Sequence, residues 1–231
     1  MTTFKKHDST STVNFKKIYS IANEFLATSN SIISFPFNVK KFIKEQSDIQ
    51  IRTFDKAHKY NVDISAFGSE SAIIIEQAGA NIIFYNQDEP LYRKIFSILH
   101  EFGHYIFGHG MNLNDEDELY RIKELEANCF AAQMLMPEQL LRECTKRGRK
   151  LTSAFIQQAF NVSNEAAERR IRTLAKTNSE WRSREEKSYD DIILLKYALK
   201  LDAIAPKKTY SYDFDIEYDR QLERDSWLSL R

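Results

Sequence analysis

The sequence is poor in cysteine, carries no net charge and contains no long apolar run. Its 231 residues include only two cysteines, Cys129 and Cys144, so no disulfide is required and a reducing compartment, the cytoplasm, is expected. The 33 basic residues balance the 33 acidic ones, which excludes a global charge that would recruit nucleic acid or an anionic membrane. No apolar segment approaches the length of a membrane span, and residues 1–12 are too polar for a secretory signal. We therefore expect a cytoplasmic protein with no membrane segment, built from one core and a small second module.

Residues 95–109 contain a pattern that is typical of a metal site. On a helix, His100 and His104 are one turn apart and project from the same face, so both imidazoles can reach one metal ion. Glu101 lies about a third of a turn away, where it can bind a water on that metal more easily than the metal itself. An apolar stripe nearly opposite the histidines predicts that the helix packs on a core; it consists of Ile95, Leu99, Phe102 and Ile106. The alternative is a pair of buried histidines satisfied by hydrogen bonds.

Two histidines leave a zinc site incomplete, because it needs a third protein ligand and an open position for water. The next helical pattern, residues 118–136 before Pro137, carries two carboxylates, Glu124 and Glu126. Glu124 shares a narrow face with small residues, whereas Glu126 points roughly to the opposite side. Glu124 is therefore the predicted ligand and Glu126 a solvated or salt-bridged surface acid. Asn128, one turn beyond Glu124, is predicted to hold a ligating histidine by its second ring nitrogen.

Gly108 is predicted to end the helix that carries His100 and His104, called here the metal helix. His109 follows directly and is predicted to be a rim or loop histidine and not a primary ligand. An oxyanion donor is not identified by the pattern. Tyr85, Tyr92, Tyr105 and His109 are equal candidates for that role.

The remaining patterns in the first half predict a small α+β domain. Apolar spacing predicts helices at 15–27 and 39–43, and alternation predicts a strand at 49–54. Residues 71–76 and 81–85 are predicted to pair as a hairpin around a turn that contains Gly79. Pro90 is predicted to lie at or near the first position of the metal helix.

These motifs resemble the ImmA/IrrE-type metallopeptidases. The resemblance rests on His100-Glu101-Phe102-Gly103-His104 and on residues 124–137, and more loosely on the order of elements over 15–176. It implies a zincin-like core in which His100, His104 and Glu124 bind Zn²⁺ and Glu101 is the catalytic base. It also implies that the protein substrate is a helix-turn-helix repressor or related regulator of a mobile element or stress response.

Residues 151–174 have the pattern of a helix-turn-helix, with Ser163 predicted to cap its second helix. That helix carries basic residues that could contact DNA; they are Arg169, Arg170, Arg172 and Lys176. The favoured interpretation is nevertheless a helical pair that packs on the catalytic core and leaves this basic face to ordinary solvation, because the net charge is zero.

The chain is thus divided into a disordered tail (1–12), a zinc metallopeptidase domain (13–145), a helix-turn-helix-like segment (146–180) and a C-terminal extension (181–231). In the extension, 181–188 is predicted to be a charged linker and 192–201 either helix or strand. Residues 210–219 alternate aromatic and acidic residues, which predicts an edge strand on the core or, alternatively, a partner-binding or inhibitory arm.

Two functions follow from these patterns. The first is a zinc metalloendopeptidase that cleaves a protein regulator, with Glu101 as general base. The alternative is a regulatory protein with a structural or sensory metal, which binds DNA or a regulator without proteolysis. That alternative predicts salt-dependent DNA binding that depends on Arg170.

Overall fold

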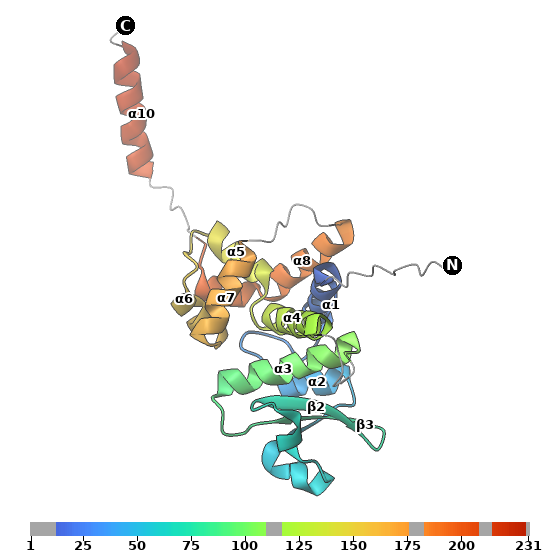
Figure 1. The fold of residues 1–231 in the computed structure, drawn as a ribbon. Coiled ribbons are helices and arrows are strands. Elements are labelled where there is room, and N and C mark those ends of the chain that lie inside the picture. The colour runs from blue at the N-terminus through green and yellow to red at the C-terminus, as the bar shows by residue number, and fades with distance from the viewer. Residues whose placement is uncertain (1–12, 110–116, 176–182, 208–213, 230–231) are drawn as a thin grey trace, which may run out of the picture.

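Residues 13–109, 117–175, 183–207 and 214–229 are described in the computed structural model of the chain. Helices make up most of it, and a three-stranded sheet lies towards one end (Figure 1). The α+β class predicted from the sequence is therefore confirmed. No helix within these ranges combines the length and the hydropathy that a membrane span requires.

The sheet consists of β1 (Gln50–Thr53), β2 (Ala72–Gln77) and β3 (Ala80–Tyr85), in the order β1-β3-β2. β3 pairs in parallel with β1 and antiparallel with β2, so β2 is an edge strand. The predicted hairpin is confirmed: Ala78 and Gly79 join β2 to β3, and both have positive φ, 51° and 77°. Two positive φ angles give the tight turn whose twist matches that of the strands it joins.

The two faces of the sheet pack against different clusters. Ile74 and Ile83 face the main core, against α3 (Leu91–Phe107), which lies beside α2 (Val39–Gln46). Ile73 and Phe84 face a smaller apolar cluster that includes Ala57 from the 3₁₀ helix η1 (Phe54–Tyr60); a second 3₁₀ helix, η2, spans Ile64–Phe67. Because both faces are covered, the strands carry continuous apolar residues and not a strict alternation.

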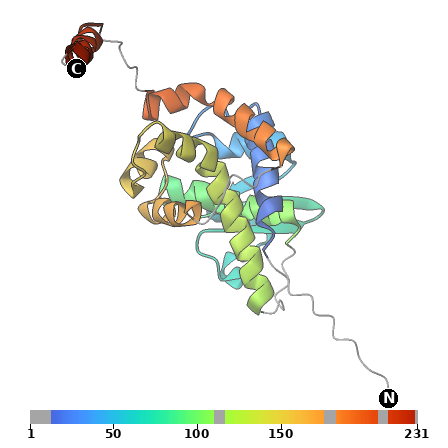
Figure 2. The same ribbon diagram turned by 90° about the horizontal axis from the view of Figure 1, so that it is seen from above.

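Helices α1 (Phe15–Thr28) and α4 (Asp117–Leu135) pack against each other, with α4 in contact with α3 (Figures 1 and 2). Their limits follow from local chemistry. The Asn14 side chain caps α1 by accepting a hydrogen bond from the Lys17 backbone amide at 3.0 Å. Pro137 follows α4 and occupies the position just before the next helix begins. The helices predicted at 15–27, 39–43 and 118–136 are all confirmed.

Contact between α3 and α4 is close because residue 103 is glycine. A Cβ on Gly103 would lie 3.2 Å from the Cα of Ala127 and 3.2 Å from a ring carbon of Phe130. Ala127 and Phe130 are completely buried, so a shift of either one would disturb packed neighbours. A larger side chain at 103 would therefore push the two helices apart, and with them the residues predicted to bind the metal.

The chain then continues through α5 (Glu138–Lys146), α6 (Ser153–Phe160), α7 (Asn164–Leu174), α8 (Arg184–Lys196) and α9 (Ala198–Ile204). As predicted, Ser163 caps α7: its hydroxyl accepts a hydrogen bond from the Ala166 amide at 3.1 Å. Figure 2 shows α8 along the side of α1, and the two helices are in contact.

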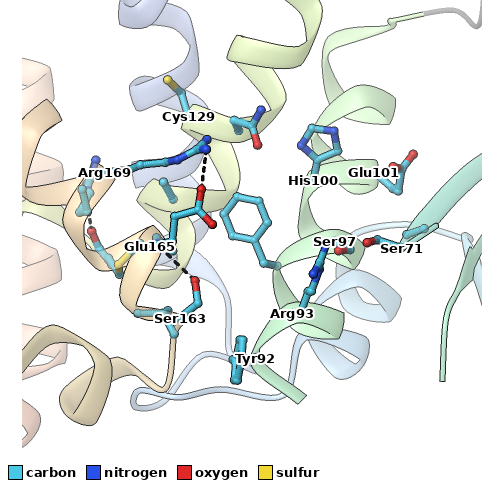
Figure 3. Close-up of a pocket in the computed structure, with 18 of the residues that line it drawn as sticks. Ser71, Tyr92, Arg93, Ser97, His100, Glu101, Cys129, Ser163, Glu165 and Arg169 are labelled. Atoms are coloured by element: carbon cyan, nitrogen blue, oxygen red, sulfur yellow. Dashed lines mark hydrogen bonds and ion pairs between the residues drawn. The ribbon is translucent and has the colours of Figure 1, made fainter. Parts of the chain in front are cut away.

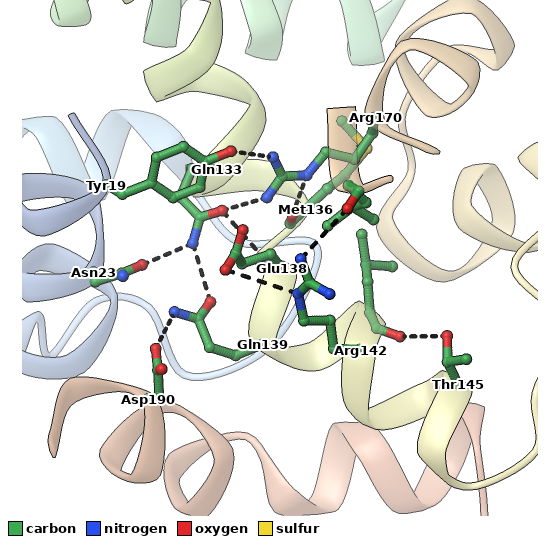
Figure 4. A network of polar contacts seen from close by, with 12 residues as sticks. Tyr19, Asn23, Gln133, Met136, Glu138, Gln139, Arg142, Thr145, Arg170 and Asp190 are labelled. Carbon is green, nitrogen blue, oxygen red and sulfur yellow. Dashed lines mark hydrogen bonds and ion pairs between the residues drawn. The ribbon is translucent and has the colours of Figure 1, made fainter. Parts of the chain in front are cut away.

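One basic residue of α7 lies inside the molecule. Arg170 is 2% exposed and donates hydrogen bonds to the carbonyl of Met136 (2.9 Å), to the hydroxyl of Tyr19 (3.1 Å) and to the side chain of Gln133. Gln133 in turn donates to Asn23 at 2.7 Å (Figure 4). This network joins α7 to α1 and α4. The prediction that Arg170 belongs to a solvated basic face is wrong, because its guanidinium is held by buried acceptors.

Two further predictions for the C-terminal part are wrong. Residues 184–188 are not a linker but the start of α8, where Ser183 and Glu186 form a reciprocal capping box. Residues 214–219 are not a strand but the start of α10 (Phe214–Ser229), which stands apart from the other helices in Figure 1. Tyr218 is 57% exposed, so this segment lacks the buried face that would favour a strand. The predicted tail 1–12, residues 210–213 and Lys176 lie outside the described residues.

The network around Arg170 generates a prediction on stability. Arg170→Leu should lower the free energy of unfolding by about 3 kcal/mol, because it leaves buried oxygen acceptors without a donor. The matched control is Arg169→Leu, since Arg169 is exposed and pairs with the exposed Glu165 at 2.6 Å. That control should cost less than about 1 kcal/mol. Denaturant unfolding of both variants measures the difference, and equal losses would contradict a structural role for Arg170.

Candidate metal centre

His100 and His104 lie on successive turns of α3 and direct their rings to one point. Their Nε2 atoms are 3.0 Å apart. Glu124 reaches the same point from α4: one carboxylate oxygen lies 3.4 Å from His100 Nε2 and the other 3.2 Å from His104 Nε2. A ligand atom from each of the three residues lies within 4.8 Å of the other two. The structure thus brings together the three residues that were predicted as metal ligands.

The residues present fit a zinc ion. Zinc in a tetrahedral site lies about 2.0–2.1 Å from its ligands, which places two ligand atoms roughly 3.3 Å apart. The separations of 3.0, 3.2 and 3.4 Å among the three residues are close to that value. Two imidazoles and one carboxylate are also a donor set that zinc commonly accepts in catalytic sites.

The charge on Glu124 suits a ligand. Hydrogen bonds with His100 and His104 hold the pKa of Glu124 far below its usual value, although partial burial opposes this. For His100, burial lowers the pKa, but Glu124, Glu101 and Asn128 together outweigh burial and raise it. Glu124 is therefore ionised at every pH near neutrality, the state in which a carboxylate binds a metal.

Glu101 lies beside His100, at the side of α3 that faces β2 (Figure 3). Burial raises the pKa of Glu101 to about 7; the charge on Glu124 adds to the effect, while His100 and the Ile74 backbone oppose it. A carboxylate with such a pKa can both take up and release a proton near neutral pH.

His109 is a part of the site that the sequence patterns missed. Its Nδ1 lies 3.1 Å from the Nδ1 of His104, and its Nε2 lies 2.9 Å from a carboxylate oxygen of Glu126. As predicted, it lies in the turn just past α3 and is not one of the three clustered ligands, but its side chain is only 7% exposed. Glu126 was predicted to be a solvated or salt-bridged surface acid, but its side chain is only 16% exposed and one of its carboxylate oxygens is hydrogen-bonded to this histidine.

A local signal for the position of His109 is present in the sequence. Gly108 adopts φ 68° at the end of α3, and the backbone amide of His109 donates to the carbonyl of His104 at 2.9 Å. The Gly108 amide also donates to the Tyr105 carbonyl at 3.1 Å, which completes a Schellman turn. This turn folds His109 back against the helix that carries His104.

Asn128 acts on the other histidine. It lies on α4 one turn beyond Glu124 and contributes to the raised pKa of His100. The Nδ1 atom of His100 is buried and has no hydrogen-bond partner among the described residues. The role of Asn128 as the partner of that nitrogen stays a prediction.

A cleft opens beside the metal centre. Its volume is about 950 Å³, and His100, Glu101 and Asn128 line one part of it (Figure 3). The opposite wall comes from α7, with Glu165 and Arg169. A second hollow, of about 690 Å³, is lined by β2 residues and by His104 and His109; the metal centre therefore has a hollow on each side.

The candidate oxyanion donors differ in position. Tyr92 lines the larger cleft, and Tyr105 lines the smaller hollow with His109. Tyr85 is buried and its hydroxyl accepts a hydrogen bond from Lys40 at 2.6 Å. The structure adds Tyr120, which was not predicted: the carboxylate of Glu124, burial and the carboxylate of Glu101 raise its pKa.

The chain was compared with known proteins. A family model described as the IrrE N-terminal-like domain of peptidase family M78 matches residues 44–172, which is more than half of the chain. The chain belongs to the M78 peptidase family. No match is found among curated proteins.

The match has two consequences for this M78 protein. It spans both motif helices and continues through α7, so the segment after the metal centre is included. It also confirms the resemblance to the ImmA/IrrE-type metallopeptidases, and a metal is therefore implied at the cluster formed by His100, His104 and Glu124.

The metal cluster generates a prediction on zinc binding. Glu124→Gln should lower the affinity for Zn²⁺ by more than about 100-fold, because removal of a direct ligand should exceed the 10- to 100-fold cost of losing an outer-shell partner. Competition with a chromophoric chelator measures the affinity. The control is Glu118→Gln, a change at an exposed position of the same helix, which should leave zinc binding unchanged. Equal affinities of the two variants would contradict the assignment of Glu124.

A further prediction uses the raised pKa of Glu101. In metal-free protein, ionisation of this carboxyl is disfavoured in the folded state, so wild-type stability is lost as the pH rises from 4.5, its ordinary pKa, to about 7. Glu101→Gln removes the ionisation. The unfolding free energy of the variant relative to wild type should therefore increase by about 2 kcal/mol between pH 4.5 and 7.5. Denaturant unfolding in the presence of a chelator tests this, and a difference that does not change with pH would contradict it.

Proposed function

We propose that this M78 protein is a zinc-dependent endopeptidase that hydrolyses peptide bonds in a protein substrate. The observation that carries the proposal is the cluster of His100, His104 and Glu124, with Glu101 beside it at the wall of a large cleft. Three protein ligands leave one position of a tetrahedral site open. An open position next to a general base favours a catalytic site over a closed structural one.

Zinc is the proposed metal because of the donor set and because the separations of the donor atoms are close to those of a tetrahedral zinc site. When bound, zinc would supply Lewis-acid chemistry, polarising the scissile carbonyl and making water a better nucleophile near neutral pH.

Glu101 is proposed as the general base. One oxygen of its carboxylate takes the proton from the attacking water and then delivers it to the leaving amine. The chain supports this role by burying Glu101 and raising its pKa to about 7, since a residue that must accept and then donate a proton works best near the operating pH.

A cysteine nucleophile is not supported as an alternative to this mechanism. Cys129 lines the cleft, but burial raises the pKa of its thiol to about 11. At neutral pH it is therefore protonated and a poor nucleophile. Both Cys129 and Cys144 are free thiols, which fits our proposal that the protein works in the reducing cytoplasm.

The substrate is proposed to be a helix-turn-helix repressor or a related regulator, as the family resemblance implies. The cleft offers charges that could select such a segment. Arg93 on α3 has a 61% exposed side chain, and Arg169 and Glu165 lie on the opposite wall, on α7. Both walls therefore present charged groups to whatever peptide occupies the cleft.

The helix pair α6 and α7 is proposed to form a wall of the substrate cleft and not a DNA-binding module. Arg170, which the DNA-binding alternative requires, is buried in a hydrogen-bond network. Arg169 lines the cleft and is paired with Glu165. These contacts favour the packing interpretation of the segment, and no contact of the described residues favours the DNA-binding alternative.

Incubation with regulators tests the proposal. The zinc-loaded protein should cut at least one purified helix-turn-helix regulator encoded beside its gene into discrete fragments. Glu101→Gln should keep its zinc and reduce the rate by about 10²- to 10⁴-fold, because general base catalysis is lost. Mass spectrometry of the fragments gives the cleavage site.

The control for this experiment is Glu118→Gln, which should cleave at the wild-type rate. Unchanged cleavage by Glu101→Gln would contradict the assigned base. Cleavage that persists after zinc is removed would contradict the metal-dependent mechanism as a whole.

A further inference from the structure

His104 is held by a partly buried chain of hydrogen-bonded side chains that the proposed reaction does not use. The chain runs from His104 Nδ1 to His109 Nδ1 (3.1 Å) and from His109 Nε2 to Glu126 Oε2 (2.9 Å). The second oxygen of Glu126 accepts a hydrogen bond from the backbone amide of Asn14 at 3.0 Å. Side chains from α3, the turn after it and α4 are thus linked to the start of α1.

The positions of the protons in this chain are determined once His104 binds a metal through Nε2. A neutral imidazole carries one proton, so a ligating Nε2 leaves the proton on Nδ1, which must then donate. The nearest acceptor is Nδ1 of His109. A His109 that accepts at Nδ1 carries its own proton on Nε2, which points at the Glu126 carboxylate. Each hydrogen bond therefore has one donor and one acceptor, with a single allowed direction.

The last acceptor in the chain is fixed in place. Glu126 side-chain exposure is 16%, and both of its carboxylate oxygens are occupied, one by His109 and one by the Asn14 amide. Asn14 also caps α1 with its side chain, which ties its backbone to the start of that helix. Rotation of the Glu126 carboxylate would break at least one of its two hydrogen bonds.

From these contacts we propose that His109 and Glu126 are positioning residues for the metal centre: they select the Nε2-ligating tautomer of His104 and fix the orientation of its ring. Carboxylates or other groups that hold the second nitrogen of a ligating histidine strengthen metal binding in general. Here a second histidine lies between the carboxylate and the ligand. For His100 the corresponding nitrogen, Nδ1, makes no hydrogen bond of this kind among the described residues, and Asn128 is its predicted partner.

This inference rests on the proposed zinc site and extends it. The test is the affinity for Zn²⁺, measured by chelator competition on metal-free protein. His109→Phe keeps the ring but removes both nitrogens, and Glu126→Leu removes the acceptor. Each should lower the affinity about 10- to 100-fold. Glu126→Gln keeps one acceptor oxygen and should restore part of the loss.

A double variant distinguishes a linked chain from two separate structural effects. His109→Phe combined with Glu126→Leu should bind zinc no more weakly than the worse single variant, because the chain is already broken. His58→Phe is the matched control, since His58 is exposed on η1, and it should bind as wild type does. Thermal unfolding of the metal-free variants identifies any that fail to fold.

Nuclear magnetic resonance can show which nitrogen of His104 is protonated, and a general loss of stability would not change that result. In the zinc-loaded protein, imidazole ¹H–¹⁵N spectra should show His104 protonated on Nδ1, with a slowly exchanging proton. That signal should exchange rapidly in His109→Phe. Affinities within about twofold of wild type, or multiplying losses in the double variant, would overturn the proposal. Failure of the wild-type protein to bind zinc at all would instead refute the proposed function.

Discussion

The close contact between α3 and α4 is the constraint on which the metal centre depends. Gly103 lies between the two histidines in the sequence and faces the backbone of Ala127, so that α4 can approach until Glu124 meets both imidazoles. No side chain other than hydrogen fits there without moving Ala127 or Phe130, both of which are completely buried. The ligand geometry is therefore a consequence of helix packing, which holds two imidazoles and a carboxylate together where they are largely shielded from water.

The second half of the chain extends this packing. Arg170 joins α7 to α1 and α4 through buried hydrogen bonds, and α7 in turn forms a wall of the cleft beside His100 and Glu101. A helix pair with the pattern of a DNA-binding unit is thus part of the surface next to the metal. Two neighbouring arginines of α7 therefore differ in role. Arg170 is buried and structural, while Arg169 is exposed to the cleft.

Local patterns predicted most of the first half of the fold. The hairpin followed from two short apolar runs on either side of a turn that contains Gly79, and the limits of α1 and α4 followed from a turn signal and from Pro137, because caps and breakers act within a few residues. The C-terminal part was less predictable. Alternation over 210–219 resembled a strand, yet Tyr218 and Leu222 are also spaced as on a helix, and their exposure leaves no core to choose between the two periods. The capping box at Ser183 could have predicted the start of α8, but the many charged residues there were interpreted as a linker.

The sequence by itself determined the identity and spacing of the groups that could bind a metal, since His100, Glu101 and His104 share one helix and Glu124 lies on a narrow face of the next. These relations are fixed by the helical repeat alone. The tertiary structure decided which groups support them. The contact of His109 with Glu126 and the burial of Arg170 join residues from different elements, and their distances depend on how those elements pack. A helical period fixes direction within one helix, but only packing fixes the distance between two.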